Sequence, residues 1–239
     1  ILQSVGAQNA QDWIARFGFD ADKHPPYLTM ALGAGSVTPL QMVTGYSVFA
    51  NGGYRVNPYL ITKVTDQLGK VLSEFKPPEL DESLRAIDAR NAYVMTSLLQ
   101  EVTRSGTAAR APVVLKRQDI YGKTGTTNDS MDAWFAGYHP SVTAVTWIGY
   151  DTPRKLGARE TGGGLSLPVW INYMQHALQN APISEPIPPA GLSHENGDWV
   201  FIEYSKGAGV TSLGLDNKSG NSELPANDEK KKILDLFRN

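Results

Sequence analysis

The chain has no cysteine among its 239 residues. It can therefore form no disulfide bond and no thiolate metal site, but this leaves the cellular compartment open, because many periplasmic proteins also lack cysteine. The net charge is only −2, and no basic stripe points to nucleic acid as a partner. The longest apolar run, residues 142–150, is too short and too rich in threonine to span a bilayer.

The sequence also lacks the residue spacing of a metal site, an initial methionine and a signal peptide. The histidines are scattered without the spacing of a metal site, at His24, His139, His176 and His194. We therefore expect neither a metal nor a cofactor. The chain begins at Ile1 and carries no signal peptide, so we expect a processed or excised piece whose anchor to the membrane lies elsewhere.

The chain does have the composition of a globular protein, with 41% hydrophobic residues. Thr38 and Gln41 form a capping box around a proline, which predicts a helix that ends at residues 51–53. Asp88 is expected to cap a second long helix with an apolar stripe at residues 95, 98, 99 and 102. Asn9 is expected to cap a short helix before Gly18, and Ser166 to open a helix that buries residues 170, 173, 174 and 177.

Alternating residues predict the strands. Residues 58–75 are expected to form a hairpin that turns at residues 66–69, and a loop through Pro112 leads to strands at residues 119–127, 132–138 and 142–150. The connections between these three strands are too short for crossovers, so the strands should run antiparallel. The last strand is apolar on both sides. The expected fold class is therefore α+β, an antiparallel sheet covered by helices on both faces.

The character of the sequence changes near residue 180. Four prolines between residues 182 and 189 predict an extended linker, and residues 198–204 predict a single strand. A polar segment with a charge run at residues 228–232 closes the chain. We expect a main domain at 1–180, a linker with a small C-terminal extension at 181–218 and a mobile tail at 219–239.

The central stretch is residues 121–127, where Lys123 and Gly125 alternate with Thr124, Thr126 and Thr127. If this strand borders a groove, each of these residue types has a physical task. Lys123 could hold a substrate carboxylate or favour the anionic form of a nearby hydroxyl. Gly125 would let a peptide backbone approach as an added strand. The N–H group of Thr126 could stabilise an oxyanion, while the Thr124 and Thr126 hydroxyls would share one face.

Other interpretations of this stretch carry less weight. A lone Lys-Thr-Gly triplet is most simply a solvated edge strand. A phosphate-binding loop would need glycine where Arg117 stands, and it would open a helix. The glycine pairs at residues 33–35 and 207–209 lack the third glycine of a dinucleotide loop. Sequence order leaves a Ser-His-Asp triad open, although no nucleophile elbow marks one.

The surrounding residues extend the pattern. Residues 121–129, 132–138 and 147–151, together with residues 38–42 and 49–58 upstream, resemble the transpeptidase domain of class A, bifunctional penicillin-binding proteins; Lys-Thr-Gly is a known signature of penicillin-binding proteins. Residues 209–216 look like the C-terminal extension of some members. The likeness covers nearly everything from residue 1 to about residue 217.

The resemblance implies a peptidoglycan cross-linking DD-transpeptidase on the periplasmic face of the bacterial inner membrane, joined to an N-terminal glycosyltransferase domain. In this family a serine attacks the D-Ala-D-Ala carbonyl of a stem peptide, D-Ala leaves, and an amine resolves the acyl-enzyme; β-lactams acylate the same serine. Carried over, Lys123 and Thr126 are the expected catalytic residues. Thr124, Gly125 and Thr127 are the expected substrate-binding residues.

One departure from the family pattern is large. The Ser-x-x-Lys nucleophile motif and the Ser-x-Asn motif should precede Lys-Thr-Gly, but the literal matches at residues 73–76 and 219–221 stand at a strand end and in the tail. We expect the true motifs upstream, in the remaining N-terminal part of the same protein, so that this chain alone is inactive and its sheet incomplete. The alternatives are a DD-carboxypeptidase or serine β-lactamase relative, and a non-catalytic penicillin-binding-like module.

Overall fold

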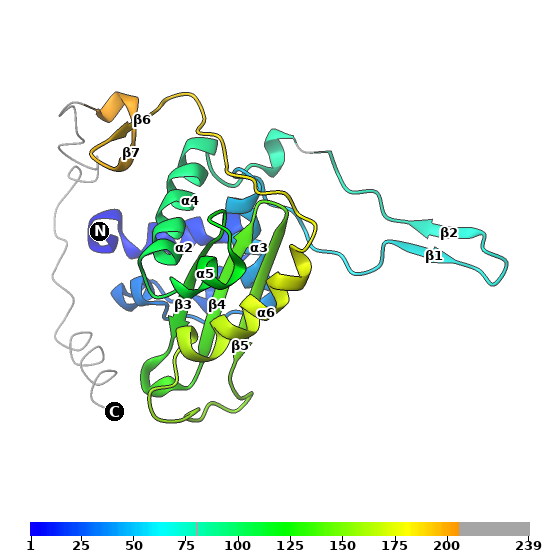
Figure 1. Cartoon of the computed structure of the whole chain (residues 1–239), viewed down its shortest axis with the longest axis horizontal. Coiled ribbons are helices and arrows are strands. Elements are labelled where there is room, and N and C mark those ends of the chain that lie inside the picture. Colours follow the sequence, from blue (N-terminus) through cyan, green and yellow to red (C-terminus); the bar gives the residue numbers. More distant parts are fainter. Residues whose placement is uncertain (80, 206–239) are drawn as a thin grey trace.

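The computed structural model describes residues 1–79 and 81–205. The expected extension at residues 209–216 and the expected tail at 219–239 lie outside these ranges. Within them, helices pack on both faces of a small sheet, and a hairpin projects far from this body (Figure 1).

The central sheet has three strands in the order β3-β4-β5, with bounds β3 (Tyr121–Thr126), β4 (Ala133–His139) and β5 (Val142–Ile148). Both pairings are antiparallel, as predicted, with Tyr121 opposite Tyr138 and Ala133 opposite Ile148. Among the described residues β3 therefore forms one edge of the sheet, which places the Lys-Thr-Gly motif on an edge strand.

One face of the sheet is covered by α5 (Arg110–Leu115) and α6 (Leu167–Ala177). Phe135 of β4 lies in this core, with its ring centroid 4.8 Å from that of Trp170 in a T-shaped contact. The remaining buried side chains come from the two helices and from residues that directly precede or follow α5, β3 and α6. They are Ala108, Ala111, Ile120, Leu167, Ile171, Met174 and Leu178. Burial of apolar side chains on this scale is the main favourable term in folding.

The opposite face is covered by α3 (Pro39–Ala50) and α4 (Ala89–Arg104). Tyr121 and Tyr138 stack there with centroids 5.1 Å apart and pack against Leu99 of α4. The Tyr138 hydroxyl lies 2.7 Å from the Thr96 hydroxyl, which satisfies its buried polar group. Helices therefore cover both faces of an antiparallel sheet, and the predicted α+β fold is confirmed.

The predicted capping signals act as expected. The Thr38 hydroxyl oxygen accepts a hydrogen bond from the Gln41 amide at the start of α3, and the Gln41 side-chain oxygen accepts one from the Thr38 amide. Asp88 caps α4 by accepting from the Arg90 amide. The helix that Ser166 was predicted to open begins at Leu167, directly after a π-helical turn, Gly162–Ser166.

Several local predictions are wrong. Asn9 lies inside α2 (Ala7–Ile14), which follows α1 (Leu2–Val5), and its side chain donates to the Val5 carbonyl instead of capping a helix. The expected loop through Pro112 is the helix α5, because Pro112 occupies an early helical position where no N–H is needed. The predicted buried stripes are only partly right, since Leu98 of α4 and Tyr173 of α6 are exposed.

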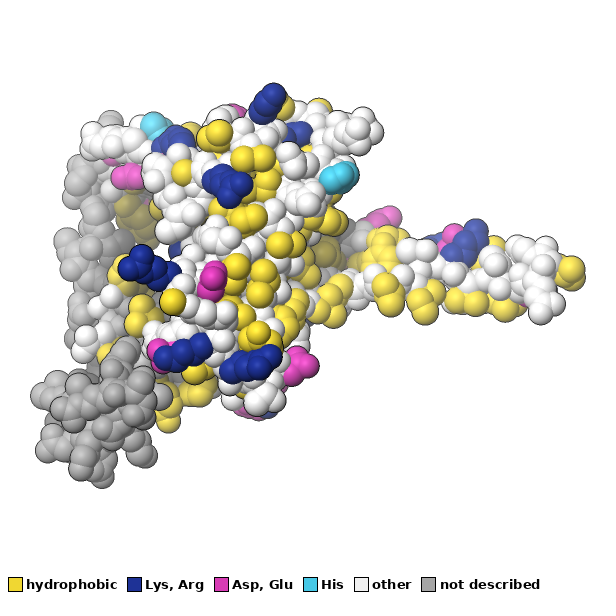
Figure 2. Space-filling view, turned by 60° about the horizontal axis from the view of Figure 1, so that its bottom comes forward, with side chains coloured by type: hydrophobic (Ala, Val, Ile, Leu, Met, Phe, Trp, Pro, Cys, Tyr) yellow, Lys and Arg dark blue, Asp and Glu magenta, His cyan; other side chains and the backbone are white. Residues whose placement is uncertain are grey.

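The hairpin predicted at residues 58–75 exists as β1 (Lys63–Thr65) and β2 (Val71–Glu74). Asp66 accepts from the amides of Leu68 and Lys70 and so closes the predicted turn. Every strand residue of the hairpin is exposed. Figure 2 shows hydrophobic side chains along much of this projecting arm.

The C-terminal part of the described chain is a second small hairpin, β6 (Leu192–Glu195) and β7 (Asp198–Phe201). The single strand predicted at residues 198–204 is therefore wrong: the chain turns into a short 3-10 helix after Phe201. This hairpin packs on α4 through a T-shaped contact between Trp199 and Tyr93, and the 3-10 helix after it is held to α4 by an ion pair of 2.9 Å between Arg90 and Glu203.

The short 3-10 helices of the described chain connect the larger elements, and they are Ala15–Phe17, Ala21–Lys23, Leu28–Leu32, Glu82–Leu84, Asn128–Ser130 and Ile202–Tyr204. Across the described ranges no helix combines the length and the hydropathy needed to cross a membrane.

Candidate active site

The Lys-Thr-Gly motif presents part of its backbone at the open edge of β3. The Thr127 amide donates to the Asp132 carbonyl at 3.1 Å, which directs Thr127 toward the neighbouring strand. Because the hydrogen-bonding direction alternates along a strand, the backbone groups of Thr124 and Thr126 point the other way, away from β4. The N–H of Thr126, predicted to bind an oxyanion, therefore points toward the edge of β3 that no described strand occupies.

Lys123 is exposed and lies at the same edge. Its Nζ donates to the Thr124 carbonyl at 2.9 Å, one of the outward-facing backbone groups. A lysine on β3 therefore leans over the strand edge and brings its positive charge next to it. A positive charge in this place favours an anionic ligand or an ionised hydroxyl beside β3.

The hydroxyls of Thr124 and Thr126 share one face of the sheet, as predicted, and this is the face of α5 and α6. Thr126 Oγ1 accepts from the Gly162 amide at 3.1 Å. Thr124 Oγ1 lies 2.7 Å from Oγ1 of Thr107, in the turn between α4 and α5. Each threonine is thus held by a different neighbouring segment.

Two glycines allow the chain to pack this closely. A Cβ on Gly162 would lie 2.2 Å from the Trp134 carbonyl oxygen and 2.4 Å from that of Gly125, so no other residue fits without a backbone shift. A Cβ on Gly125 would lie 3.1 Å from the Cβ of Trp134. Gly125 is therefore close-packed against its neighbour on β4.

Thr127 ends the motif and closes the connection to β4. Its Oγ1 accepts from the Asp132 amide at 2.7 Å, and Asp132 Oδ1 accepts from Trp147 Nε1 at 2.8 Å. The next residues, Asp129 and Ser130, have positive φ angles of 58° and 52°. Asp129 also pairs with Lys155 at 2.9 Å, so the β3–β4 connection is tied to the loop that follows β5.

A buried polar network anchors the start of β3. Asp119 is fully buried and accepts from Arg117 at 2.8 Å and from the Ser184 amide at 2.8 Å. Burial alone would raise the pKa of Asp119, but these hydrogen bonds outweigh it and hold the pKa below its ordinary value. Burial lowers the pKa of His139, more than the neighbouring Asp119 carboxylate raises it. The network joins β3, the end of β4 and the linker after α6.

Four of the predicted site residues, Lys123, Thr124, Gly125 and Thr126, therefore lie on β3 at one edge of the sheet, and Thr127 follows directly after the strand. Sequence reasoning missed Thr107, Gly162 and Asp132, the residues that hold the motif from outside it. Their only local signals were a small residue in a turn, a glycine run and an acidic residue before a strand. None of these indicates which segment the residue will contact.

The described structure places neither literal match to the other two family motifs, Ser-x-x-Lys and Ser-x-Asn, at this edge. Residues 73–76, a literal match to the nucleophile motif, lie at the exposed end of β2, so their serine does not open a helix. The match at residues 219–221 lies outside the described residues. No group of acidic residues and histidines in the described ranges could hold a metal ion.

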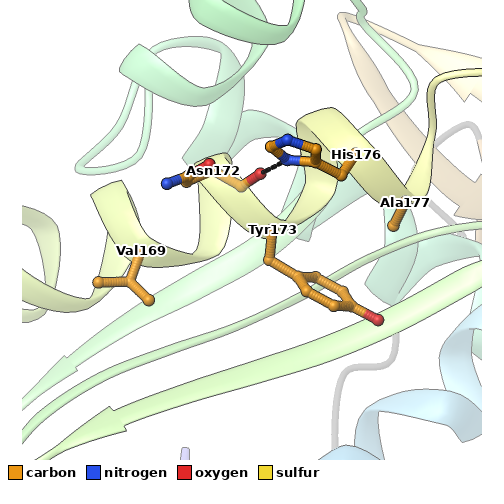
Figure 3. Close-up of a pocket in the computed structure, with 5 residues that line it drawn as sticks. All are labelled: Val169, Asn172, Tyr173, His176 and Ala177. Atoms are coloured by element: carbon orange, nitrogen blue, oxygen red, sulfur yellow. Dashed lines mark hydrogen bonds between the residues drawn. The ribbon is translucent and has the colours of Figure 1, made fainter.

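A shallow hollow lies on the outer side of α6, lined by Val169, Asn172, Tyr173, His176 and Ala177 (Figure 3). His176 Nδ1 lies 2.9 Å from the Asn172 carbonyl, so the imidazole is engaged within its own helix. None of these side chains comes from β3. The hollow is therefore separate from the motif.

The chain is similar in sequence to known proteins of one family. A family profile described as "Penicillin binding protein transpeptidase domain" matches residues 1–174. Penicillin-binding protein 1A of Neisseria lactamica is 44% identical over 216 residues, which cover 90% of this chain and 26% of that protein. Penicillin-binding protein 1A of Pseudomonas aeruginosa is 39% identical and is covered to 29%.

The crystal structure of penicillin-binding protein 1A from Haemophilus influenzae superposes on 88% of this chain with a TM-score of 0.78 at 31% identity, and 38% of that structure is covered. The chain spans about a quarter of the length of the curated relatives it matches. The fold, the edge position of the Lys-Thr-Gly strand and these similarities agree: the chain belongs to the family of penicillin-binding protein transpeptidase domains.

Proposed function

We propose that this chain forms one wall of the acyl-transfer site of a peptidoglycan DD-transpeptidase. The observation that carries the proposal is the edge of β3, where the Lys123 ammonium and the outward-facing backbone of Thr124 and Thr126 lie together. An extended stem peptide can add to such an edge as a further strand.

The reaction has two steps. A serine oxygen attacks the carbonyl carbon of the penultimate D-Ala, the C–O bond of an acyl-enzyme forms, and the peptide C–N bond breaks as the leaving D-Ala takes up a proton. An amine of a second stem peptide then attacks the acyl carbon: the new C–N bond forms, the ester C–O bond breaks, and the serine oxygen takes up a proton from that amine. A β-lactam follows only the first step, in which its ring C–N bond opens.

Each motif residue has a part in this reaction. The Thr126 N–H stabilises the developing oxyanion, a role worth roughly 2.7–4 kcal/mol for one donor elsewhere. Lys123 favours the ionised serine electrostatically. Thr124 and Thr126 donate to the terminal carboxylate of the substrate or drug, Gly125 leaves room for its backbone, and Thr127 adds to substrate binding by closing the turn that follows the motif.

We further propose that the serine and the Ser-x-Asn motif belong to another part of the same polypeptide, with an N-terminal glycosyltransferase domain and a membrane anchor at the periplasmic face of the bacterial inner membrane. The coverage of about a quarter of the relatives' length is consistent with this arrangement. Stem peptides and β-lactams are then the ligands.

Labelling with a fluorescent penicillin tests the proposal in the complete protein that carries this chain. We expect covalent labelling of the wild type and a loss of at least about tenfold in labelling rate for Lys123→Met, because an ion contact at the reacting group is removed. Lys63→Met is the matched control, since Lys63 lies on the projecting hairpin and pairs with Glu74. Equal labelling of Lys123→Met and wild type would refute the role of this edge.

A further inference from the structure

Thr107 contacts the motif from outside it. Its hydroxyl oxygen lies 2.7 Å from that of Thr124, although the two residues are 17 positions apart. Thr107 belongs to the turn between α4 and α5, and it is exposed, so a bound molecule could reach the hydroxyl pair.

The turn that carries Thr107 is held firmly. The next residue, Ala108, is fully buried, and its amide donates to the Val102 carbonyl at 3.1 Å. On the other side, a Cβ on Gly163 would lie 3.2 Å from the Thr107 carbonyl oxygen and 3.8 Å from Cγ2 of Thr124. Three segments of the chain therefore meet at this pair: packing places the Thr107 backbone, and the hydrogen bond to Thr124 places its hydroxyl.

The hydroxyls of Thr107, Thr124 and Thr126 each carry one proton. Only one proton lies between Thr107 and Thr124, so the pair retains a second proton for an outside acceptor. Thr126 uses its oxygen to accept from the Gly162 amide, which leaves its own proton to donate. The threonines on this face thus offer two O–H donors, and a carboxylate has two oxygens to accept them.

We propose that Thr107 is a positioning residue for the carboxylate of the ligand: it donates to Thr124 and thereby directs the Thr124 proton outward. A hydroxyl that accepts one hydrogen bond becomes a better donor for the next, so the contact also strengthens the bond to the carboxylate. This inference rests on the proposed function, since it assigns the source of specificity within the same site.

The test compares a penicillin with its methyl ester, which has the same reactive ring but no carboxylate. Second-order acylation rates are measured in the complete protein for wild type, Thr107→Val and Thr107→Ser. Valine keeps the shape of threonine and lacks the hydroxyl. We expect Thr107→Val to lose about 2- to 12-fold toward the penicillin, the factor that corresponds to one net hydrogen bond, and to retain its rate toward the ester. Thr107→Ser should restore the wild-type ratio.

Ser105→Ala is the matched control, because Ser105 lies two residues away in the same turn and its hydroxyl contacts Glu101 instead of the motif. An equal loss toward penicillin and ester in Thr107→Val, or no loss toward either, would overturn the inference while wild-type acylation left the proposed function intact. A wild type that neither compound acylates would overturn the proposed function itself.

Discussion

At the scale of single residues, the position of β3 depends on Gly162, because the space beside the strand leaves no room for a side chain there. The Gly162 amide donates to Thr126 Oγ1, and a side chain at this position would meet the backbone oxygens of Trp134 and Gly125. Both oxygens belong to the sheet, so neither can rotate away. Gly164, in the same π-helical turn, is different, because a Cβ there would meet only the Thr161 hydroxyl at 3.3 Å.

Gly162→Ala is therefore expected to destabilise the complete protein by about 1–3 kcal/mol, the usual cost of forcing an extra methyl group into a packed region. It should also slow acylation by penicillin, because the backbone of β3 must move. Gly164→Ala is the matched control. Chemical denaturation measures the first effect, and equal stability of the two variants would contradict the packing argument.

His139 is buried at the end of β4, in contact with Asp119, Arg117 and Ser141. The Ser141 amide donates to Nδ1 at 3.1 Å, and Nε2 lies 3.1 Å from Asp119 Oδ2 and 2.9 Å from Arg117 Nη2. The lowered pKa of His139 means that the unfolded state takes up a proton on acidification before the folded state does. Stability must then fall as the pH drops below the ordinary value of 6.5.

We therefore expect the free energy of unfolding of the complete protein to decrease between about pH 7.5 and about pH 5.5, and His139→Asn to flatten this dependence. Asp119 does not interfere, because its lowered pKa means that its contribution is lost only in stronger acid, below its ordinary value of 3.8. Denaturant titrations at several pH values provide the measurement. His176→Asn, a change on the exposed side of α6, should keep the wild-type profile; a steep profile in His139→Asn would exclude the imidazole as the cause.

At the scale of elements, capping signals predicted α3 and α4, alternation predicted β4, and a run that is apolar on both faces predicted β5, because these patterns act within a few residues. The Thr38–Gln41 box is an example, since both partners lie in one turn. Prediction failed for α5, where Pro112 was taken as a loop residue although a proline fits an early helical position. In the site, the residues on β3 were predicted from their own run, but the contacts from Thr107 and Gly162 depend on tertiary packing, which no local pattern encodes.

The β1–β2 hairpin stands apart from the rest of the described chain. The chain leaves the body near Tyr54 and returns at Arg85, where the two residues form an antiparallel bridge. The rings of Tyr59 and Phe75 lie against each other at the base of the hairpin, with centroids 4.0 Å apart and an interplanar angle of 34°. Since every strand residue beyond this base is exposed, the hairpin contributes little to the core (Figure 1).

Replacing residues 58–79 by a short glycine-serine linker is accordingly expected to leave the stability of the complete protein within about 0.5 kcal/mol of wild type, and to leave penicillin labelling unchanged. Thermal unfolding and labelling rates measure the two effects. Arg85→Ala is the contrasting variant, because Arg85 pairs with Glu82 and contacts Tyr54 at the closure point, and its loss should lower stability. A large loss of stability on excision would show that the hairpin packs against a part of the protein outside the described residues.

At the scale of the whole molecule, the described sheet is small. Its three strands leave β3 and β5 each paired on one side only among the described residues, and the chain covers about a quarter of the length of its curated relatives. Unpaired strand edges and exposed apolar side chains both favour association with other chains. Large exposed apolar side chains occur in several elements, including Leu40 of α3, Val113 of α5 and Tyr173 of α6.

For this reason we expect the isolated 239-residue chain to lack a cooperative thermal transition and to bind no fluorescent penicillin covalently. The complete protein is expected to unfold cooperatively and to be labelled. Differential scanning calorimetry and gel fluorescence after labelling measure the two properties side by side. Calorimetry reports whether the isolated chain folds, and labelling reports whether it contains the nucleophile. A cooperative transition without labelling would mean that the wall formed by β3 folds alone and lacks only the nucleophile. Covalent labelling of the isolated chain would mean that a serine within these residues is the nucleophile. The proposed division of the active site between two parts of the polypeptide would then be wrong.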